Sequence, residues 1–339
     1  MTYQNVGTPR FYIDIPTYLN SIGARTESHS SQIDFLNLNP NIQKPMIDMS
    51  DYFSTLFYSN IILDVDFKNI CNPNKFFVAL LNHNFGTHPD VKLDLTFWLS
   101  NLSAVLNAEG VGDFQFNNNG SSIIIGEHDP DKQYFRLLFD NADSLNFQLG
   151  CLAFGSYYDM PHSPELNINM DIINDGFKSM QTTGGSHLNN IKYNSAPMWK
   201  RADGVQVPPW TIGEPVAVGR RRGRRSWSMD FNYLDEKDLM SSNYMSNRYI
   251  ENSSGYISSD LGTNDNDEQE FYFNINSDDS FVAQVLNKIG NGQRFIFQPD
   301  NNNNNPDQFA ICQLDQNSLN IKQVANGVYN ISLKITEVW

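Results

Sequence analysis

Apolar and polar side chains alternate at every second residue along much of this chain. In residues 91–99 the odd positions read Val, Leu, Leu, Phe, Leu and the even positions read Lys, Asp, Thr, Trp. Successive side chains of a strand point to opposite sides of a sheet, so this period of two predicts β-strands. Alternation, or a short apolar run between turn residues, predicts further strands at 60–67, 76–81, 122–125, 134–139, 147–154, 226–234, 271–275, 294–297, 309–314 and 329–335.

Residues 281–289 carry their apolar side chains at helical spacing instead. Asp278, Asp279 and Ser280 come directly before this segment and can cap a helix at its positive end. Gly290 follows it and supplies a stop. The sequence therefore predicts an all-β, mainly antiparallel fold with one short helix.

Two long segments interrupt the strand pattern. Residues 193–223 are rich in proline and glycine, and residues 240–270 are rich in Ser, Asn and Asp. An irregular stretch of this length in a compact protein usually contacts a partner or stays mobile. A length of 339 residues suggests about two domains. We expect an N-terminal segment (1–49) that packs on the second domain, a β-sandwich (50–170), and a second β-domain (171–339) with a long insertion at 240–270.

The net charge and the cysteines limit which classes of function are expected. A formal net charge of −15 argues against a dedicated nucleic-acid binder, because an acidic chain repels phosphate backbones. The three cysteines, Cys71, Cys151 and Cys312, are far apart and form no C-x-x-C pair, so we expect buried, reduced thiols. We expect a soluble protein with no membrane span, since no stretch of about 18 apolar residues occurs.

Motifs that carry chemistry are sparse. The six histidines include no pair at the spacing of metal ligands, and residues 265–269 lack the glycine and glutamate of a calcium loop. No nucleophile elbow, phosphate-binding loop or dinucleotide fingerprint occurs. We expect a non-enzymatic protein with no catalytic residue, cofactor or metal. A glycosidase-like hydrolase stays open as an alternative, since acidic β-rich folds host such enzymes.

The sharpest local anomaly is the run G-R-R-R-G-R-R-S-W at residues 219–227, which holds five of the 23 basic residues. Its guanidinium groups could clamp carboxylates of a neighbouring subunit, contact DNA passing through a lumen, or lie in a solvated loop that enters a strand. The acidity of the chain favours protein carboxylates. We therefore assign to a subunit interface Arg220, Arg221, Arg222, Arg224 and Arg225.

Residues 80–86, L-L-N-H-N-F-G, resemble a turn of discoidin-like (galactose-binding-like) domains of phage tail proteins. Residues 134–137, 149–155 and 158–161 resemble the late strands of that domain, so the resemblance covers about residues 50–165. It implies a discoidin-like β-sandwich. It also implies an alternative function, a carbohydrate-binding adhesion module that recognises a host-surface glycan. The candidate glycan contacts are His83, Asn84, Tyr157 and Tyr158.

The second half resembles phage distal tail and minor tail proteins. The similarity lies in the strand at 225–233, the helix at 281–289, F-I-F-Q-P at 295–299 and the final strand at 328–339, and the opening 8–14 is similar too. This resemblance implies a virion protein that assembles in the host cytoplasm into a homo-oligomeric ring, commonly hexameric, around the tail-tip channel. Its implied partners are other virion tail proteins, with nucleic acid only passing through the lumen. The insertion at 240–270 departs from the compact family pattern.

Overall fold

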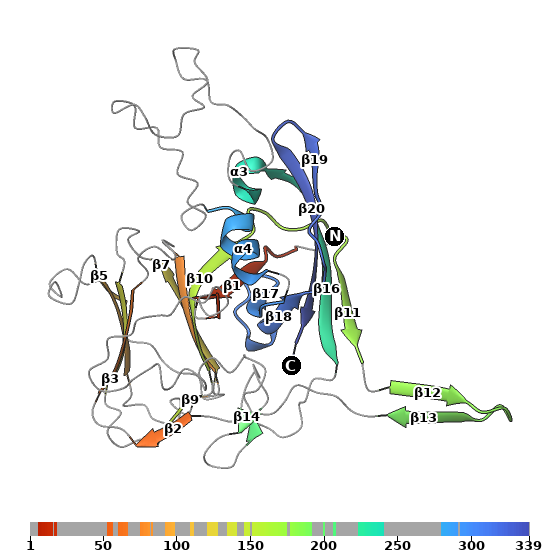
Figure 1. Cartoon of the computed structure of the whole chain (residues 1–339), viewed down its shortest axis with the longest axis horizontal. Helices are drawn as coiled ribbons and strands as arrows, with labels where there is room; N and C mark the ends of the chain where they lie inside the picture. Colours follow the sequence, from red (N-terminus) through yellow and green to blue (C-terminus); the bar gives the residue numbers. More distant parts are fainter. Residues whose placement is uncertain are drawn as a thin grey trace, which may run out of the picture.

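The computed structural model describes residues 6–15, 17–18, 53–56, 60–66, 75–81, 83, 92–98, 109–111, 121–127, 134–140, 146–149, 151–174, 177–191, 199–200, 206–207, 223–240, 279–290 and 292–338. Within these ranges the protein is mainly β, with a large antiparallel sheet and one short helix packed on its core (Figure 1). The predicted fold class is confirmed at this level.

The large sheet has ten strands. In spatial order they are β11 (Asn169–Ile173), β16 (Arg224–Asp235), β20 (Val328–Glu337), β18 (Ala310–Leu314), β17 (Phe295–Gln298), β1 (Arg10–Asp14), β10 (Cys151–Asp159), β4 (Lys75–Leu81) and β7 (Ser121–Glu127), with β19 (Ile321–Ala325) paired to β20. All of these pairs are antiparallel.

Smaller sheets accompany the large one. One has the order β3 (Asn60–Asp66), β8 (Tyr134–Asp140), β5 (Lys92–Trp98) and β6 (Glu109–Val111). Three two-stranded sheets pair β2 (Phe53–Leu56) with β9 (Asn146–Leu149), β12 (Phe177–Gln181) with β13 (His187–Ile191), and β14 (Trp199–Lys200) with β15 (Gln206–Val207). Figure 1 draws the four-stranded sheet at the end of the molecule where β7 lies.

Most strands predicted from alternation are present. The predicted segments 60–67, 76–81, 91–99, 122–125, 134–139, 226–234, 294–297, 309–314 and 329–335 each coincide with a strand to within a few residues. The structure divides the segment predicted at 147–154 between β9 and β10, which lie in different sheets. The predicted strand at 271–275 lies outside the described residues, as do most of the two irregular segments.

The large sheet is buried on both faces at its centre. Along β1, Phe11 and Ile13 point into one apolar cluster, and Tyr12 points into another. Strand β17 repeats the division, with Phe295 and Phe297 in the first cluster and Ile296 in the second. Alternate side chains of a strand lie on opposite faces, so these two clusters sandwich the central strands.

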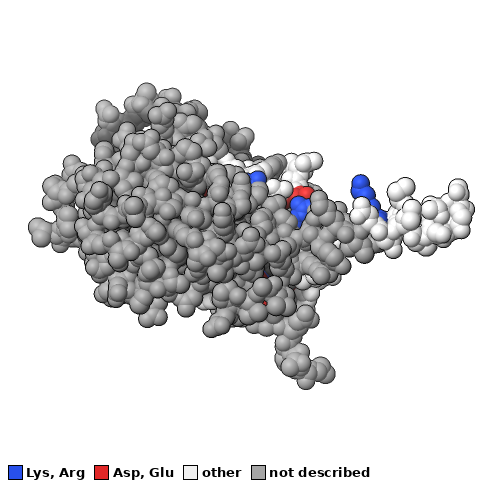
Figure 2. Space-filling view, turned by 90° about the horizontal axis from the view of Figure 1, so that it is seen from below, with Lys and Arg blue, Asp and Glu red and all other residues white. Residues whose placement is uncertain are grey.

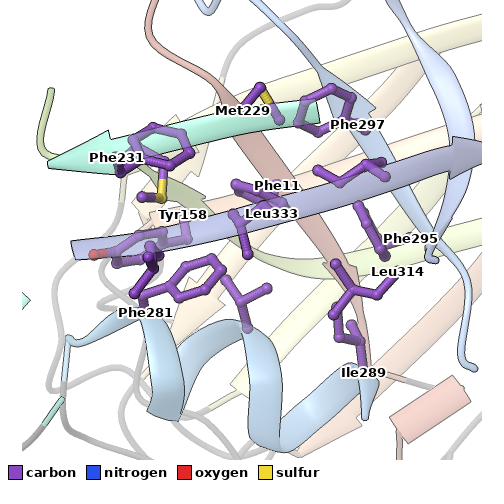
Figure 3. Close-up of a cluster of buried hydrophobic side chains, with 14 of the residues drawn as sticks. Phe11, Tyr158, Met229, Phe231, Phe281, Ile289, Phe295, Phe297, Leu314 and Leu333 are labelled. Atoms are coloured by element: carbon purple, nitrogen blue, oxygen red, sulfur yellow. The ribbon is translucent and has the colours of Figure 1, made fainter. Parts of the chain in front are cut away.

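The predicted helix forms and covers the first cluster (Figure 3). It consists of η3 (Val282–Leu286) and α4 (Asn287–Ile289), and Ser280 Oγ accepts a bond of 3.4 Å from the Ala283 amide at its start. The chain leaves the helix at Gly290, whose φ of 51° favours glycine. A further one-turn helix, α3 (Glu236–Leu239), follows β16.

Strand β1 joins the two halves of the chain. It pairs with β17 on one side and with β10 on the other. Arg10 lies opposite Asp159 of β10 and donates to its carboxylate from Nε at 2.6 Å and from Nη2 at 2.9 Å. The expected boundary at residue 170 falls within β11, and strands from both sides of it belong to one continuous sheet.

Candidate subunit interface

Strand β11 forms one edge of the large sheet and exposes an apolar row. Within the described ranges β11 pairs only with β16. Met170 is 51% exposed and Ile172 is 55% exposed, and they lie opposite Trp227 and Arg225 on the face of the buried cluster. Leu166, just before the strand, is 76% exposed. The apolar face of the sheet therefore continues past the covered core to an uncovered edge.

The end of β11 is held close to the start of β16 by a glycine. Gly223 has a φ of 74°, and a Cβ added there would lie 2.6 Å from Ile172 Cγ2 and 2.9 Å from the Ile173 carbonyl oxygen. Only glycine fits this left-handed position without displacing the neighbouring strand. The second glycine of the arginine-rich run thus fixes where the edge strand lies.

A β-hairpin, called the arm here, follows β11 after three residues and consists of β12, β13 and their turn (residues 177–191). It extends away from the sheet as a two-stranded ribbon (Figures 1 and 2). The Thr182 amide donates to the Ser186 carbonyl at 2.9 Å, and this hydrogen bond closes the turn within the arm. The arm is therefore stabilised within itself, while its side chains are left for contact with something else.

The arm has two different faces. Met180 and Leu188 lie opposite each other and are 70% and 61% exposed. Ser179 and Asn189 lie opposite each other on the other face, where the serine hydroxyl donates to Asn189 Oδ1 at 2.8 Å. A two-stranded ribbon in water is marginally stable at best, and a cross-strand apolar pair contributes only about 0.2–1 kcal/mol to it. Such a pair is typical of a surface that is covered on association.

The structure places Arg225, one of the predicted interface residues, inside its own subunit. Its guanidinium donates to Glu337 from Nε and Nη2, each at 3.2 Å, and lies 4.9 Å from the Trp227 ring centroid. Nη1 and Nη2 also donate to the carbonyl oxygens of Asp307, at 2.6 Å, and Phe309, at 3.0 Å. Arg225 is buried, so its charge stabilises the junction of β16, β20 and β18.

The other arginines of the run differ in position. Arg224 is partly exposed at the first residue of β16 and pairs in the β-ladder with Ile173 of the edge strand. Arg220, Arg221 and Arg222 lie outside the described residues. The subunit-interface role stays a prediction for these four residues, and Arg224 lies beside the exposed edge.

The candidate glycan contacts are mostly core residues. Tyr157 and Tyr158 belong to the two apolar clusters, and the Tyr158 hydroxyl donates to the Asp238 carbonyl at 2.8 Å. His83 is buried, with Nε2 2.9 Å from Ser122 Oγ. Asn84 lies outside the described residues. These burials favour a packing role for the two tyrosines and the histidine.

No group of three or more His, Cys, Asp or Glu side chains in the described ranges is placed to hold a metal ion. None of the helices in that part of the chain has the length and hydrophobicity needed to cross a membrane.

The sequence reasoning missed both the edge strand and the arm. A signal for each exists. Residues 165–172 read E-L-N-I-N-M-D-I, which alternates in polarity, and Gly184-Gly185 stands between two five-residue runs as a hairpin turn does. Both signals are weak because these segments contain few apolar side chains.

Searches of protein-family models and of curated protein sequences found no match to this chain.

Proposed function

We propose that this chain is a structural, non-enzymatic subunit of a tailed-phage virion. In this proposal it forms a ring at the distal tail, or tail tip, which connects the tail tube to hub or receptor-binding proteins. The motif resemblances of residues 50–165 and of the second half support the virion assignment.

The observation that carries the proposal is the arm. Met180 and Leu188 present apolar surface on a ribbon that extends away from its own sheet, beside an edge strand that exposes Met170 and Ile172. A chain that exposes two distinct apolar patches can form heterologous contacts, and such contacts close into a ring when the rotation between copies allows it. Both features therefore favour a protein that functions as an assembly.

The carbohydrate-binding alternative has less support among the described residues. Three of its four candidate contacts, His83, Tyr157 and Tyr158, are buried. A sugar stacks on an exposed aromatic face, so these tyrosines would have to leave the core to bind one.

Electron microscopy tests the proposal at two levels. Negative-stain images of the purified chain should show closed rings of one diameter. Phage particles that encode the chain should bind an antibody against it at the distal end of the tail. A chain that never forms rings, or particles that bear no label on the tail, would overturn the corresponding part of the proposal.

A further inference from the structure

We propose that the arm of one copy docks on the β11 edge of another copy, adding a strand to the large sheet. This inference rests on the proposed function, since it names the two surfaces that join the subunits. We assign the edge of β11 to the arm of a second copy because the chain itself contains both matching surfaces.

The edge strand and the strands of the arm match in length. Strands β11, β12 and β13 each contain five residues. Strand β11 has a neighbour in the sheet, β16, on one side only within the described ranges. An extended strand that joins such an edge makes main-chain hydrogen bonds along its whole length. A partner strand of equal length leaves no unpaired overhang.

The edge strand and the arm each have one apolar face. On β11, Met170 and Ile172 share one face, and Asp171 lies on the other. On the arm, Met180 and Leu188 share one face with Lys178, and His187 lies on the other. Both elements have a period of two, so a single alignment places apolar against apolar and the imidazole on the side of the aspartate. The apolar rows of both elements then lie side by side on one face of the extended sheet, where cross-strand contacts bury part of each side chain.

The edge strand and the arm carry charges of opposite sign. Residues 165–174 contain Glu165 and Asp171 and no Lys, Arg or His. Residues 177–191 contain Lys178 and His187 and no Asp or Glu. Figure 2 accordingly shows blue but no red on the projecting arm. The arm and the edge strand are therefore complementary in charge.

The arm is directed away from the edge of its own copy. Only residues 174–176 separate β11 from β12, and Figure 1 shows the arm leaving the sheet from the end of β11. Among the described residues the arm forms no β-ladder with its own β11. Docking on another copy needs no change in this geometry.

Disulfide trapping tests the contact. In a full chain with Cys71→Ser, one preparation carries Met170→Cys or Ile172→Cys, and a second carries Met180→Cys or Leu188→Cys. The two are mixed at low protein concentration, concentrated so that they assemble, and oxidised. The matched control replaces the edge variant with Asp171→Cys, one residue away on the opposite face. All five residues are exposed, so these substitutions should leave the fold intact. Circular dichroism verifies this for each variant.

At least one apolar pairing should give a covalent dimer of two different variants at a yield several-fold above every Asp171→Cys pairing. Equal yields from both faces, or none from the apolar pairings while the wild-type chain still assembles, would overturn the docking and leave the proposed ring intact. A wild-type chain that is monomeric throughout would overturn both.

Discussion

Glu337 and Arg225 form a buried ion pair between residues 112 positions apart in the chain. Glu337 accepts from the Arg225 backbone amide at 3.0 Å as well as from its guanidinium at 3.2 Å. The pair therefore fixes the start of β16 against the end of β20, next to the edge that β11 completes.

Replacing Arg225 by Met should destabilise the fold by about 3–5 kcal/mol, because Glu337 would remain buried without a counter-charge. The double variant Arg225→Met/Glu337→Met should unfold at higher urea concentration than the single variant. Lys237→Met serves as the control, because Lys237 Nζ lies 4.0 Å from Asp235 Oδ2 in an exposed pair, and it should change the free energy of unfolding little. Urea titrations check this, and a double variant weaker than the single one would contradict it.

Replacing Gly223 by Ala should loosen the edge strand. The new Cβ would press on Ile172 and Ile173, and the left-handed backbone would cost about 1–3 kcal/mol in addition. Amide hydrogen exchange in residues 169–173 should become faster. Gly184→Ala, where a Cβ meets nothing within 4 Å, provides the control. Unchanged exchange in the Gly223→Ala variant would show that this close approach is unimportant.

Cys151 and Cys312 should be unreactive in the native protein and reactive in urea. Both thiols are buried, and burial, with a contribution from Asp14, raises the pKa of Cys151 well above its usual range. Thiol titration without reductant should count three reactive groups after denaturation, including Cys71, which lies outside the described residues. A count below three would mean that a disulfide is present.

Asp14 should make stability fall as pH rises. Burial raises the pKa of its carboxyl to about 6, although it accepts bonds from the Thr17 hydroxyl and from the Thr17 and Phe154 amides. In the unfolded chain the carboxyl ionises near 3.8. Between these values the folded state binds more protons, so the contribution of Asp14 decreases from pH 4 to pH 6, by about 3 kcal/mol in all.

The Asp14→Asn variant isolates this effect. Its free energy of unfolding, measured in urea at pH 4 and at pH 6.5, should lack the fall that the carboxyl contributes to the wild-type protein. The same pH slope in both proteins would mean that Asp14 ionises normally in the folded state.

The sequence predicts most of the long strands but not β1. Strand β16 alternates clearly because one face carries Trp227, Met229 and Phe231 and the other is polar. Strand β1 reads R-F-Y-I-D and hides its period, since both faces are buried and every central position is apolar. Its place between β17 and β10 depends on contacts far apart in the chain, which periodicity does not report.

The candidate interface shows the same limit. The arginine run is visible in the sequence, but only the fold reveals that Arg225 is bonded to Glu337 within its own subunit. Charge reversal at Arg225 should therefore destabilise the monomer itself, so it cannot test the predicted interface role of the run. Charge reversal at Arg224 alone, next to the exposed edge, is the better test of that prediction.

Arm-dependent assembly is the central claim, and mass photometry of the full chain tests it most directly. The wild-type protein should show one oligomer of defined mass. Met180→Asn/Leu188→Asn, which removes the apolar face of the arm, should shift it to folded monomers. Ser179→Asn/Gln181→Asn, which places two asparagines on the opposite face of the arm, should leave the oligomer in place. A wild-type protein that stays monomeric, or an oligomer unaffected by the loss of Met180 and Leu188, would contradict the account.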